Sequence, residues 1–553
     1  MKISELEQEI QSLKIMVESQ SVQIAKLEAL VNFYEEQFKL AQRFRFGSSS
    51  EHSPEQLHFE NIFNEAEDQA DSLLPEPTYE EITYKRKKRV GKREEDLAGL
   101  PVERIDYELP ESMRICPECE EVRHDIGVTI RHELKIIPAQ VIHVEHAVHA
   151  YGCANCEKNG ESTPITKAEA PTPLISGSLA SPSTVAYIAS QKYVNGVPLY
   201  RQEKGLAYDG VTLSRQTMAN WLVYCAQNYL SAIYSLMIAF LLKETILHAD
   251  ETTVQVLHEP GRAAQTKSYE WVYRTSGYST HPVVIYEYRE TREQERPKKF
   301  LKGFAGYLHT DGYQSYHNLP SDIIVVGCWA HARRYWVDVY ETVTESKRDG
   351  SIAERGLVYC NLLFALEDDY RDLSPEERRK ERLKRSKPVS DEFFTWVDSI
   401  NALPKSLLGK AVHYALAQRK YLENIYLDGR LELSNNRAER SIKPFVQGRK
   451  AWLFSNTPDG AESSSIIYSI IETAKENGLN PYQYLKHLLE TLPTAKVRDL
   501  ETLLPWSTSL PDSCRAPVKP MKATPIRKKD KGPLNLALTK LRERFEKTEH
   551  PSV

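Results

Sequence analysis

Residues 246 to 326 hold five short apolar runs and one helical pattern, in an order that restricts the fold more than any other part of this 553-residue chain. The runs are ILHADETTVQVL, SYEWVYRT, PVVIYEY, GYLHTDG and DIIVVGC, and each has the length and the β-branched or aromatic content of a strand. A helix is expected at residues 293 to 303, between the third and fourth runs. Three strands, a helix and two more strands predict a domain built around one five-stranded sheet.

Three acidic residues occupy marked positions in this pattern. Asp250 lies within the first strand, Asp311 follows the fourth, and Glu439 falls in the first turn of a later helix announced by Ser434-Asn435-Asn436. The strand order resembles that of a ribonuclease H-like domain, in which a first-strand carboxylate, a second after the fourth strand and a third from a late helix come together. Such a cluster can hold two Mg²⁺ (or Mn²⁺) ions for in-line phosphoryl transfer.

Each acidic residue also has a simpler interpretation. Asp250 and Glu251 could be exposed charges on a strand, and Asp311 begins an Asp-Gly turn. Asn436 and Glu439 have the spacing of a capping box, which needs no catalysis. Taken together with the strand order, the three carboxylates favour a catalytic site.

A second chemical signal is the pair of Cys-x-x-Cys motifs formed by Cys116 with Cys119 and Cys153 with Cys156. This spacing lets two thiolates bind one tetrahedral Zn²⁺, and two such pairs complete a structural zinc site. The alternating sequence between the pairs predicts a hairpin that brings them together, and three histidines within it could replace a thiolate. A redox role is less favoured because that chemistry needs only one pair.

The N-terminal segment, residues 1 to 46, carries a heptad pattern. The first core position is held by Ile3, Ile10, Val17, Ile24, Val31 and Phe38, and the second by Leu6, Leu13 and Leu27. This choice of residues favours a parallel two-stranded coiled coil, and therefore self-association of the chain as a dimer. The alternative is a lone amphipathic helix packed on its own protein.

A helix-turn-helix is predicted within residues 182 to 226. Ser214 would cap its second helix, whose first turns carry Arg215, Gln216 and Asn220, side chains suited to base edges and phosphates. An ordinary helical hairpin would have the same pattern.

The composition excludes some classes of protein but does not by itself identify a function. The net charge of −5 does not itself indicate a nucleic-acid binder, although residues 85 to 93, KRKKRVGKR, carry seven basic side chains. The N-terminus lacks the apolar core of a signal peptide, and the apolar stretch at 232 to 242 is too short to span a bilayer. We therefore expect a cytoplasmic, nucleoid-associated protein with no membrane partner and reduced cysteines.

Several motifs give the chain a close resemblance to transposases of the insertion-sequence-66 family. They are Phe46-Gly47-Ser48-Ser49-Ser50-Glu51 after the zipper, the paired Cys-x-x-Cys module, Ala249-Asp250-Glu251-Thr252, Thr310-Asp311-Gly312-Tyr313, Cys328-Trp329-Ala330-His331-Ala332-Arg333-Arg334 and Asn435-Asn436-Arg437-Ala438-Glu439-Arg440. A short C-terminal segment after Trp452-Leu453-Phe454 completes the match.

The resemblance implies a DDE transposase with Asp250, Asp311 and Glu439 as its Mg²⁺-binding triad, and it implies a helical insertion at about 340 to 430. His331 and Arg334 would approach the scissile phosphate or an end nucleotide, or else form a structural pair at the strand end. Arg437 and Arg440, which flank the glutamate, would clamp phosphates, with a structural role equally open.

These features predict a multidomain α+β chain. The expected segments are a coiled-coil zipper at 1–46, a linker at 47–100, a zinc-binding module at 101–170, a helical DNA-binding region at 171–245, a ribonuclease H-like core at 246–456, a C-terminal helical segment at 457–504 and a largely disordered tail at 505–553. The expected activity is binding of terminal inverted repeats in double-stranded DNA, cleavage at the element ends and strand transfer, with accessory proteins of the same element as possible partners. The alternatives are a non-catalytic DNA-binding regulator and a ribonuclease or resolvase on the same core.

Overall fold

The computed structural model describes residues scattered between 11 and 38, Val102 and Arg104, and residues 140 to 151, 166 to 517 and 533 to 548. The chain divides into two compact units. The first comprises Met1–Ser49, Pro171–Ala516 and Ile526–Val553, and the second comprises Ser50–Ala170 and Pro517–Pro525. The predicted linker and the four cysteines of the zinc module lie outside the described residues.

In the second unit, β1 (Ala150–Tyr151) pairs antiparallel with β2 (Thr166–Lys167). In the first unit, the described residues between 11 and 38 are helical. Their apolar side chains are exposed, among them Val17, Ile24 and Val31 at 56 to 63%. The coiled coil stays a prediction, since a single chain leaves its core positions without a partner helix.

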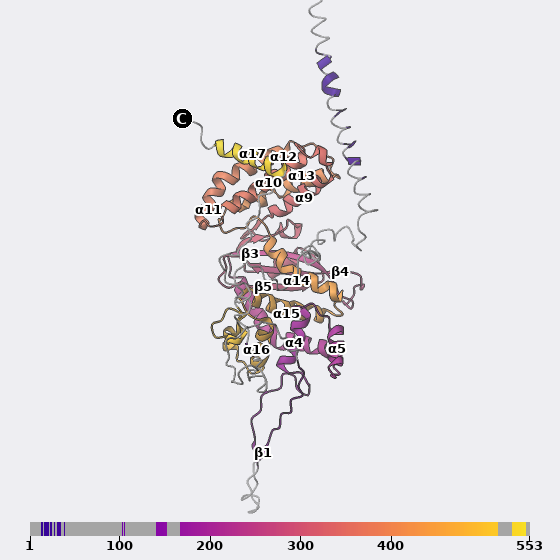
Figure 1. The fold of residues 1–553 in the computed structure, drawn as a ribbon, viewed down its shortest axis with the longest axis vertical. Coiled ribbons are helices and arrows are strands. Elements are labelled where there is room, and N and C mark those ends of the chain that lie inside the picture. Colours follow the sequence, from indigo (N-terminus) through magenta and orange to yellow (C-terminus); the bar gives the residue numbers. More distant parts are fainter. Residues whose placement is uncertain are drawn as a thin grey trace, which may run out of the picture. The chain divides into compact units, whose positions relative to one another are not determined.

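A five-stranded sheet forms the centre of the first unit (Figure 1). Its strands are β3 (Ile246–Gln255), β4 (Lys267–Thr275), β5 (Val284–Arg289), β6 (Gly306–His309) and β7 (Ile323–Val326). Their order across the sheet is β5-β4-β3-β6-β7, with β4 antiparallel to both neighbours and β6 and β7 parallel to β3. Helix α8 (Glu295–Phe300) stands between β5 and β6 in the chain, so the predicted five strands and intervening helix are confirmed.

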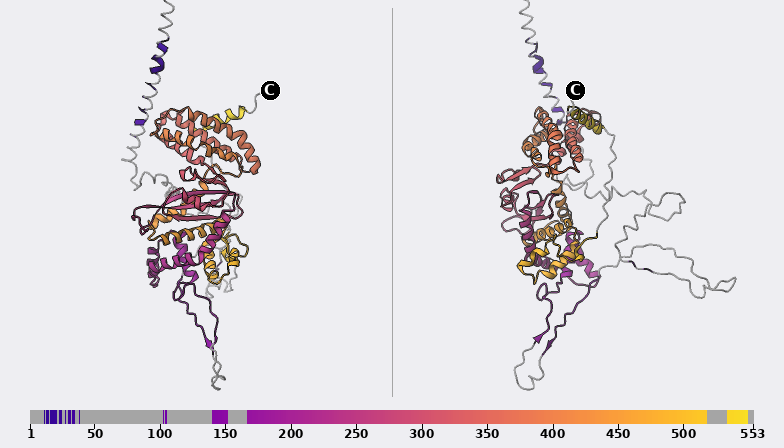
Figure 2. Two further views of the ribbon diagram at one scale, coloured as in Figure 1. Left: turned by 180° about the vertical axis from the view of Figure 1, so that it is seen from behind. Right: turned by 90° about the vertical axis from the view of Figure 1, so that its left-hand side faces the viewer.

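Helices cover both faces of the sheet because its strands are apolar on both sides. On one face, α14 (Asn436–Trp452) contacts β3 and β4, and α15 (Pro458–Glu476) contacts β5 (Figure 2). The rings of Tyr286 and Tyr468 meet there, 5.4 Å apart. On the opposite face, Tyr273 stacks on Phe300 of α8 at 3.8 Å.

The hydroxyl groups of α15 satisfy the outer edge of β5. The Val284 amide donates to Thr473 Oγ1 at 3.0 Å, and the Tyr286 amide donates to Ser469 Oγ at 2.8 Å. An open strand edge is a template for unwanted pairing, so this helix both satisfies and covers it.

Helices α4 (Pro182–Tyr193), α5 (Leu199–Tyr208) and α6 (Arg215–Cys225) form the predicted helical region, and Ser214 caps α6 by accepting from the Thr217 amide at 3.1 Å. The π-helical turn η3 (Ala226–Leu230) and α7 (Ser231–Leu241) continue α6 without a break. By length and composition alone, this run could cross a membrane. Parts of α6, η3 and α7 contact α15.

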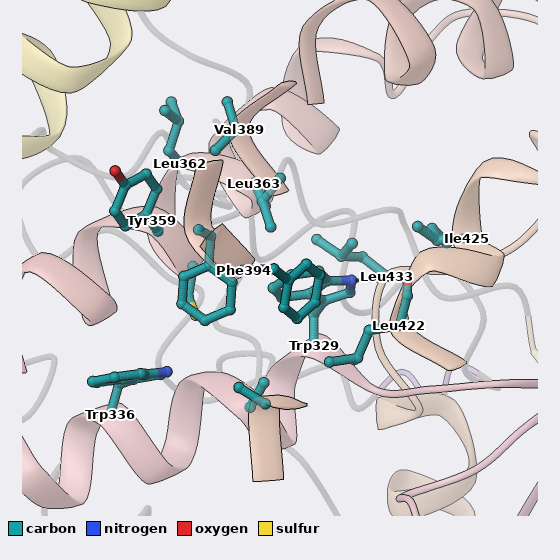
Figure 3. Packing of buried hydrophobic residues seen from close by; sticks show 14 of the residues in the cluster. Trp329, Trp336, Tyr359, Leu362, Leu363, Val389, Phe394, Leu422, Ile425 and Leu433 are labelled. Atoms are coloured by element: carbon teal, nitrogen blue, oxygen red, sulfur yellow. Dashed lines mark hydrogen bonds between the residues drawn. The ribbon is translucent and has the colours of Figure 1, made fainter. Parts of the chain in front are cut away.

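The predicted helical insertion lies between β7 and α14. It comprises α9 (Trp329–Thr342), α10 (Ile352–Asp369), α11 (Pro375–Glu381), η6 (Arg382–Ser386), α12 (Lys387–Asp398) and α13 (Leu407–Glu423), with the short 3₁₀ turns η5 (Glu345–Lys347) and η7 (Asn424–Tyr426). Helices α9, α10, α12 and α13 share a core whose aromatic residues include Trp329, Trp336, Tyr359 and Phe394 (Figure 3). The insertion is therefore a packed subdomain with its own core.

The C-terminal part contains α16 (Pro481–Thr491), η8 (Val497–Leu503) and η9 (Asp512–Cys514). Residues 505 to 517 were predicted to begin a disordered tail, and this was wrong. Leu510 and Cys514 are buried, and the Asn480 amide donates to the Cys514 carbonyl at 2.8 Å. Apolar contacts hold this segment although its prolines suggested otherwise. Helix α17 (Pro533–Thr548) packs on α10 through Leu538 and Phe545.

Candidate active site

The parallel pairing of β3 with β6 places Asp250 and Asp311 just beyond the paired residues of these two neighbouring strands. His248 of β3 lies beside His309 of β6 in the register. Asp250 and Asp311 each follow two residues later, so strand periodicity directs them to the same side as the histidines. Asp250 therefore lies in the middle of β3, two residues beyond the part paired with β6, and Asp311 lies two residues beyond the end of β6.

The turn after β6 is fixed by the helical insertion. Asp311 Oδ1 accepts from the Tyr313 amide at 2.9 Å, and Tyr414 of α13 donates to the Asp311 carbonyl at 2.8 Å. Gly312 has φ +95°, and a Cβ there would lie 2.9 Å from Gln418. The Asp-Gly turn interpretation is thus correct as local geometry, and it leaves Asp311 Oδ2 for another partner.

Glu439 sits in the first turn of α14, against the start of α9. His331 Nδ1 lies 3.6 Å from Glu439 Oε1, and Arg334 Nη2 lies 3.6 Å from Oε2. The capping-box interpretation is wrong: the N-cap residue is Asn435, and its side chain makes no capping hydrogen bond. Within the described part of the chain, the buried Oε1 of Glu439 has no hydrogen-bond partner.

Asn435 joins three of the elements that carry the predicted site residues. Its side-chain Nδ2 donates to the Ala249 carbonyl on β3 at 2.8 Å, and its amide donates to Cys328 Sγ, at the start of α9, at 3.1 Å. Its Oδ1 lies 3.0 Å from His248 Nδ1. Asn435 is fully buried, so its polar atoms form hydrogen bonds with these protein groups instead of with water. From the sequence pattern, Asn435 is expected only to mark the start of a helix.

Beneath the carboxylates, the rings of His248 and His309 stack 4.4 Å apart with an interplanar angle of 10°. Because Asn435 Nδ2 already donates to a carbonyl, its Oδ1 accepts from His248 Nδ1. His309 Nε2 accepts from the Glu432 amide at 3.3 Å. Burial lowers the pKa of His248 to about 3 and that of His309 well below its usual value, so both rings are neutral.

The carboxylates interact strongly. Burial raises the pKa of Asp250 well above its usual value, and the charges of Asp311, Glu251 and Glu439 raise it further. Glu251 is not the exposed strand charge that one interpretation allowed, since its side chain is 1% exposed and paired with Arg292. Burial and Asp311 raise the pKa of Glu251 to about 7, against the opposing effect of Arg292.

This arrangement fits a divalent cation held by oxygen ligands. Asp250, Asp311 and Glu439 come from three separate elements, and the charges of the other two act on Asp250. Glu439 Oε1 has no hydrogen-bond partner among the described residues. Cations relieve such repulsion, and hard oxygen donors suit Mg²⁺ or Mn²⁺. Among the described residues, Cys328, His331 and Glu439 place ligand atoms within 4.8 Å of one another, whereas Asp250, Asp311 and Glu439 do not form a group this close. Cys328 Sγ already accepts a hydrogen bond from the Asn435 amide, and a sulfur ligand suits Mg²⁺ or Mn²⁺ less well than carboxylate oxygens do.

The predicted DNA-binding residues lie on three helices, and His331 and Arg334 of α9 are the pair already described beside Glu439. Arg215, Gln216 and Asn220 are exposed on α6, where Gln216 Nε2 donates to Asn220 Oδ1 at 3.1 Å. On α14, Arg437 and Arg440 differ. Arg437 is ion-paired to Glu432 at 2.7 Å, which favours its structural role, whereas Arg440 is exposed.

Comparison with known proteins follows the same segments. Residues 177–463, which contain all three carboxylates, match the model of the transposase IS66 family. Residues 469–506 match the IS66 C-terminal element, 113–157 the zinc-finger binding domain of transposase IS66, and 34–105 a segment described as the transposase C of IS166 homeodomain. The chain belongs to the IS66 family of transposases, as its motifs indicated.

Full-length relatives occur in Sinorhizobium fredii. The uncharacterized protein y4qI is 29% identical over 524 residues, covering 90% of this chain and 92% of the relative. The uncharacterized protein y4jD is 31% identical over 421 residues, covering 73% of this chain and 80% of the relative. Membership of the family implies a function in transposition, with a zinc-finger segment and a divalent-metal-dependent core.

Proposed function

We propose that this transposase cleaves and joins DNA at a two-metal site formed by Asp250, Asp311 and Glu439. The observation that carries the proposal is geometric. Asp250 and Asp311 follow the paired residues of two neighbouring parallel strands, and Asn435 joins the first turn of α14, which carries Glu439, to the Ala249 carbonyl of β3. The strand order β5-β4-β3-β6-β7 supports a ribonuclease H-like core, whose third carboxylate comes from a late helix.

Mg²⁺ or Mn²⁺, when bound, would activate the attacking water or 3′-hydroxyl and stabilise the leaving oxygen of an in-line displacement. Asp250, Asp311 and Glu439 would hold these ions through carboxylate oxygens. Asn435 would keep Glu439 in register with β3. His331 and Arg334, both beside Glu439, would face the scissile phosphate, where a guanidinium can donate two hydrogen bonds to its oxygens.

The remaining segments would supply recognition and assembly. Exposed Arg215, Gln216 and Asn220 on α6 would contact double-stranded DNA at the element ends, and the zinc module would add to that contact. The N-terminal helix would pair two chains so that two ends meet in one complex. Accessory proteins of the same element and a cytoplasmic, nucleoid-associated location belong to this proposal as well.

Nicking of supercoiled plasmid in Mn²⁺ tests the proposal. The wild-type protein should convert supercoiled to open-circular plasmid, and Asp250→Asn, Asp311→Asn and Glu439→Gln should each slow this roughly 100-fold or more, because each removes a metal ligand. Asp322→Asn, an exposed acid before β7, is the matched control and should nick at the wild-type rate.

Two results would point to the alternatives. DNA binding without metal-dependent nicking would favour the non-catalytic regulator. Nicking without joining of the freed 3′-hydroxyls to a second DNA would favour the ribonuclease or resolvase. Equal nicking by wild type and Asp250→Asn would contradict the assignment of the site.

A further inference from the structure

The turn that ends α14 combines an unusual backbone conformation with exposed apolar side chains. Leu453 has φ +67°, and it is the only non-glycine residue with a positive φ in the described part of the chain. That conformation is costly for a residue with a Cβ and is usually given to glycine. Leu453 is also 66% exposed, and its neighbour Phe454 is 42% exposed. Backbone conformations of this kind cluster at sites that contact other molecules, which makes this turn a candidate contact.

The backbone on both sides holds this turn in shape. The Leu453 amide donates to the Arg449 carbonyl at 2.6 Å, as the last bond of the helix. On the far side, the Ser455 amide donates to the Gln255 carbonyl at 2.9 Å, and the Leu257 amide donates to the Ser455 carbonyl at 3.0 Å. The two apolar side chains therefore project from a rigid support, between α14 and the end of β3.

The solvent face of α14 leads from Glu439 to this turn and is basic. At 100° per residue, Arg440, Lys443, Gln447 and Lys450 fall within an arc of about 80°. Arg440, Gln447 and Lys450 are exposed, and Lys443 is half-buried. The buried residues, among them Ile442 and Phe445, lie on the opposite side against the sheet. Glu439 is the single acidic residue in α14.

We propose that α14 and its terminal turn form a contact surface for duplex DNA. Arg440, Lys443 and Lys450 would bind phosphates, and Leu453 and Phe454 would insert between stacked bases as an apolar wedge. The occupant is DNA because every charged residue of α14 beyond Glu439 is basic and the apolar tip is small, as in proteins that kink DNA. It rests on the proposed function, since it leads away from the proposed metal site.

The dimensions agree with this partner. A rise of 1.5 Å per residue places Leu453 about 21 Å along the helix axis from Glu439. Duplex DNA rises 3.4 Å per base pair, so this is about six base pairs. DNA with its scissile phosphate at Glu439 would reach the turn without leaving the basic face, and bases opened there would hold the end in register for cleavage.

Duplexes of 40 base pairs that carry 2-aminopurine in TA steps, mixed with the full chain in EDTA, test the insertion without cleavage. Unstacking raises 2-aminopurine fluorescence, so we expect wild type to raise it several-fold in at least one duplex. Leu453→Gly and Phe454→Ala should bind the same duplexes without the rise. Leu427→Ala, another exposed leucine, is the matched control and should behave as wild type.

Thermal unfolding of the same variants separates contact from folding. Leu453→Gly should raise the melting temperature, because glycine adopts φ +67° without strain, while it removes the fluorescence rise. A residue needed only for folding would not show these opposite changes. A full rise with Leu453→Gly and Phe454→Ala overturns the proposal, and so does wild-type binding without any rise.

Salt dependence of binding tests the basic face. Arg440→Ala, Lys443→Ala and Lys450→Ala should each reduce the slope of log Kd against log [NaCl] by about 0.9, the value for one phosphate contact. Lys302→Ala, an exposed lysine after α8, should leave the slope unchanged. Unchanged slopes for all three α14 variants overturn the phosphate contacts. If the wild type nicks plasmid as expected but shows neither effect, only this inference fails; if it binds no DNA, the proposed function fails with it.

Discussion

At the residue scale, the site depends on side chains that bind no metal themselves. Asn435 is fully buried, and its amide group connects the first turn of α14 to the Ala249 carbonyl and the His248 ring. If this link is lost, Glu439 is no longer held against β3. A small displacement of one ligand weakens a metal site whose ligands come from different elements.

We therefore predict that Asn435→Ala raises the Mn²⁺ concentration needed for half-maximal nicking by about 10-fold or more. Asn424→Ala is the matched control, because Asn424 Nδ2 donates to the Val325 carbonyl at 2.7 Å but touches none of the carboxylates. Both variants should lower the melting temperature, since each leaves a buried carbonyl without its donor. Equal Mn²⁺ requirements in the two variants would show that Asn435 acts only through stability.

A second residue-scale prediction concerns pH. Burial raises the pKa of Glu270 to about 8, although Ser465 acts in the opposite direction. The folded state thus keeps this proton up to about pH 8, whereas the unfolded state loses it near the ordinary value of 4.5. The unfolded state binds fewer protons in that window, so stability falls as pH rises from about 4.5 to about 8.

Glu270→Gln removes this titration while keeping the shape of the side chain. Chemical denaturation between pH 6.5 and 8.5 should give a flatter decline of the unfolding free energy in Glu270→Gln than in wild type. The histidine pair, with lowered pKa values, affects stability below about pH 6.5 and does not interfere. Parallel declines in the two proteins would mean that Glu270 is already ionised in the folded state.

At the scale of elements, the helical insertion is part of the site rather than an appendage. Arg382, 1% exposed, donates to the Leu431 carbonyl at 2.7 Å and to the Asp428 carbonyl at 3.1 Å, so η6 holds the segment that leads into α14. Tyr414 of α13 holds the turn of Asp311. Two of the three carboxylates are thus positioned by helices that follow β7 in the chain.

The packing of α9 on α10 leaves no room for an added methyl group at Gly356. A Cβ at Gly356 would lie 2.2 Å from the ring of Trp336. Gly356→Ala should therefore lower stability by about 1–3 kcal/mol through overpacking, measured by chemical denaturation. Gly205→Ala in α5 is the control, since a Cβ there meets nothing within 4 Å and alanine favours the helix. Loss of stability in Gly205→Ala but not in Gly356→Ala would contradict the close packing of these two helices.

The sequence predicted the elements better than it predicted their contacts. The apolar runs and their β-branched or aromatic content predicted β3 to β7, and a helical pattern predicted α8. The order of the strands then pointed to Asp250 and Asp311. Periodicity carries no information about partners distant in the chain. The side chain of Asn435 turns toward β3, 186 residues away, instead of capping its own helix. Its local pattern gave no sign of this.

The sequence also did not predict which charged side chains form ion pairs or become buried. The sequence gives no reason to distinguish Arg437 from Arg440. In the structure Arg437 forms an ion pair with Glu432, whereas Arg440 is exposed to solvent. Glu251 is buried beside Arg292, 41 residues away. Residues 505 to 517 carry prolines and still pack, because Leu510 and Cys514 find apolar neighbours. Each difference arose from tertiary contact overriding a local signal.

At the scale of the whole molecule, we assign DNA recognition and DNA cleavage to different segments of the chain. The family match at 113–157 supports zinc binding by Cys116, Cys119, Cys153 and Cys156, which lie outside the described residues. The purified protein should then contain about one Zn²⁺ per chain. Replacing Cys116 and Cys153 with serine should remove the zinc, measured by elemental analysis, and weaken DNA binding.

The same double variant should still nick plasmid in Mn²⁺ at high protein concentration, since the three carboxylates belong to the other compact unit. Full retention of zinc would show that other residues bind it. Loss of nicking that high concentration does not restore would show that the zinc module contributes to the chemistry.

The central claim is that Asp250, Asp311 and Glu439 hold the catalytic metal ions together. Anomalous X-ray scattering from crystals soaked in Mn²⁺ tests it most directly, because the signal locates manganese without reference to activity. We predict a peak within about 2.0–2.5 Å of oxygens from all three carboxylates, which disappears in Asp250→Asn. Manganese bound elsewhere in the core, or an unchanged peak in Asp250→Asn, would contradict the account.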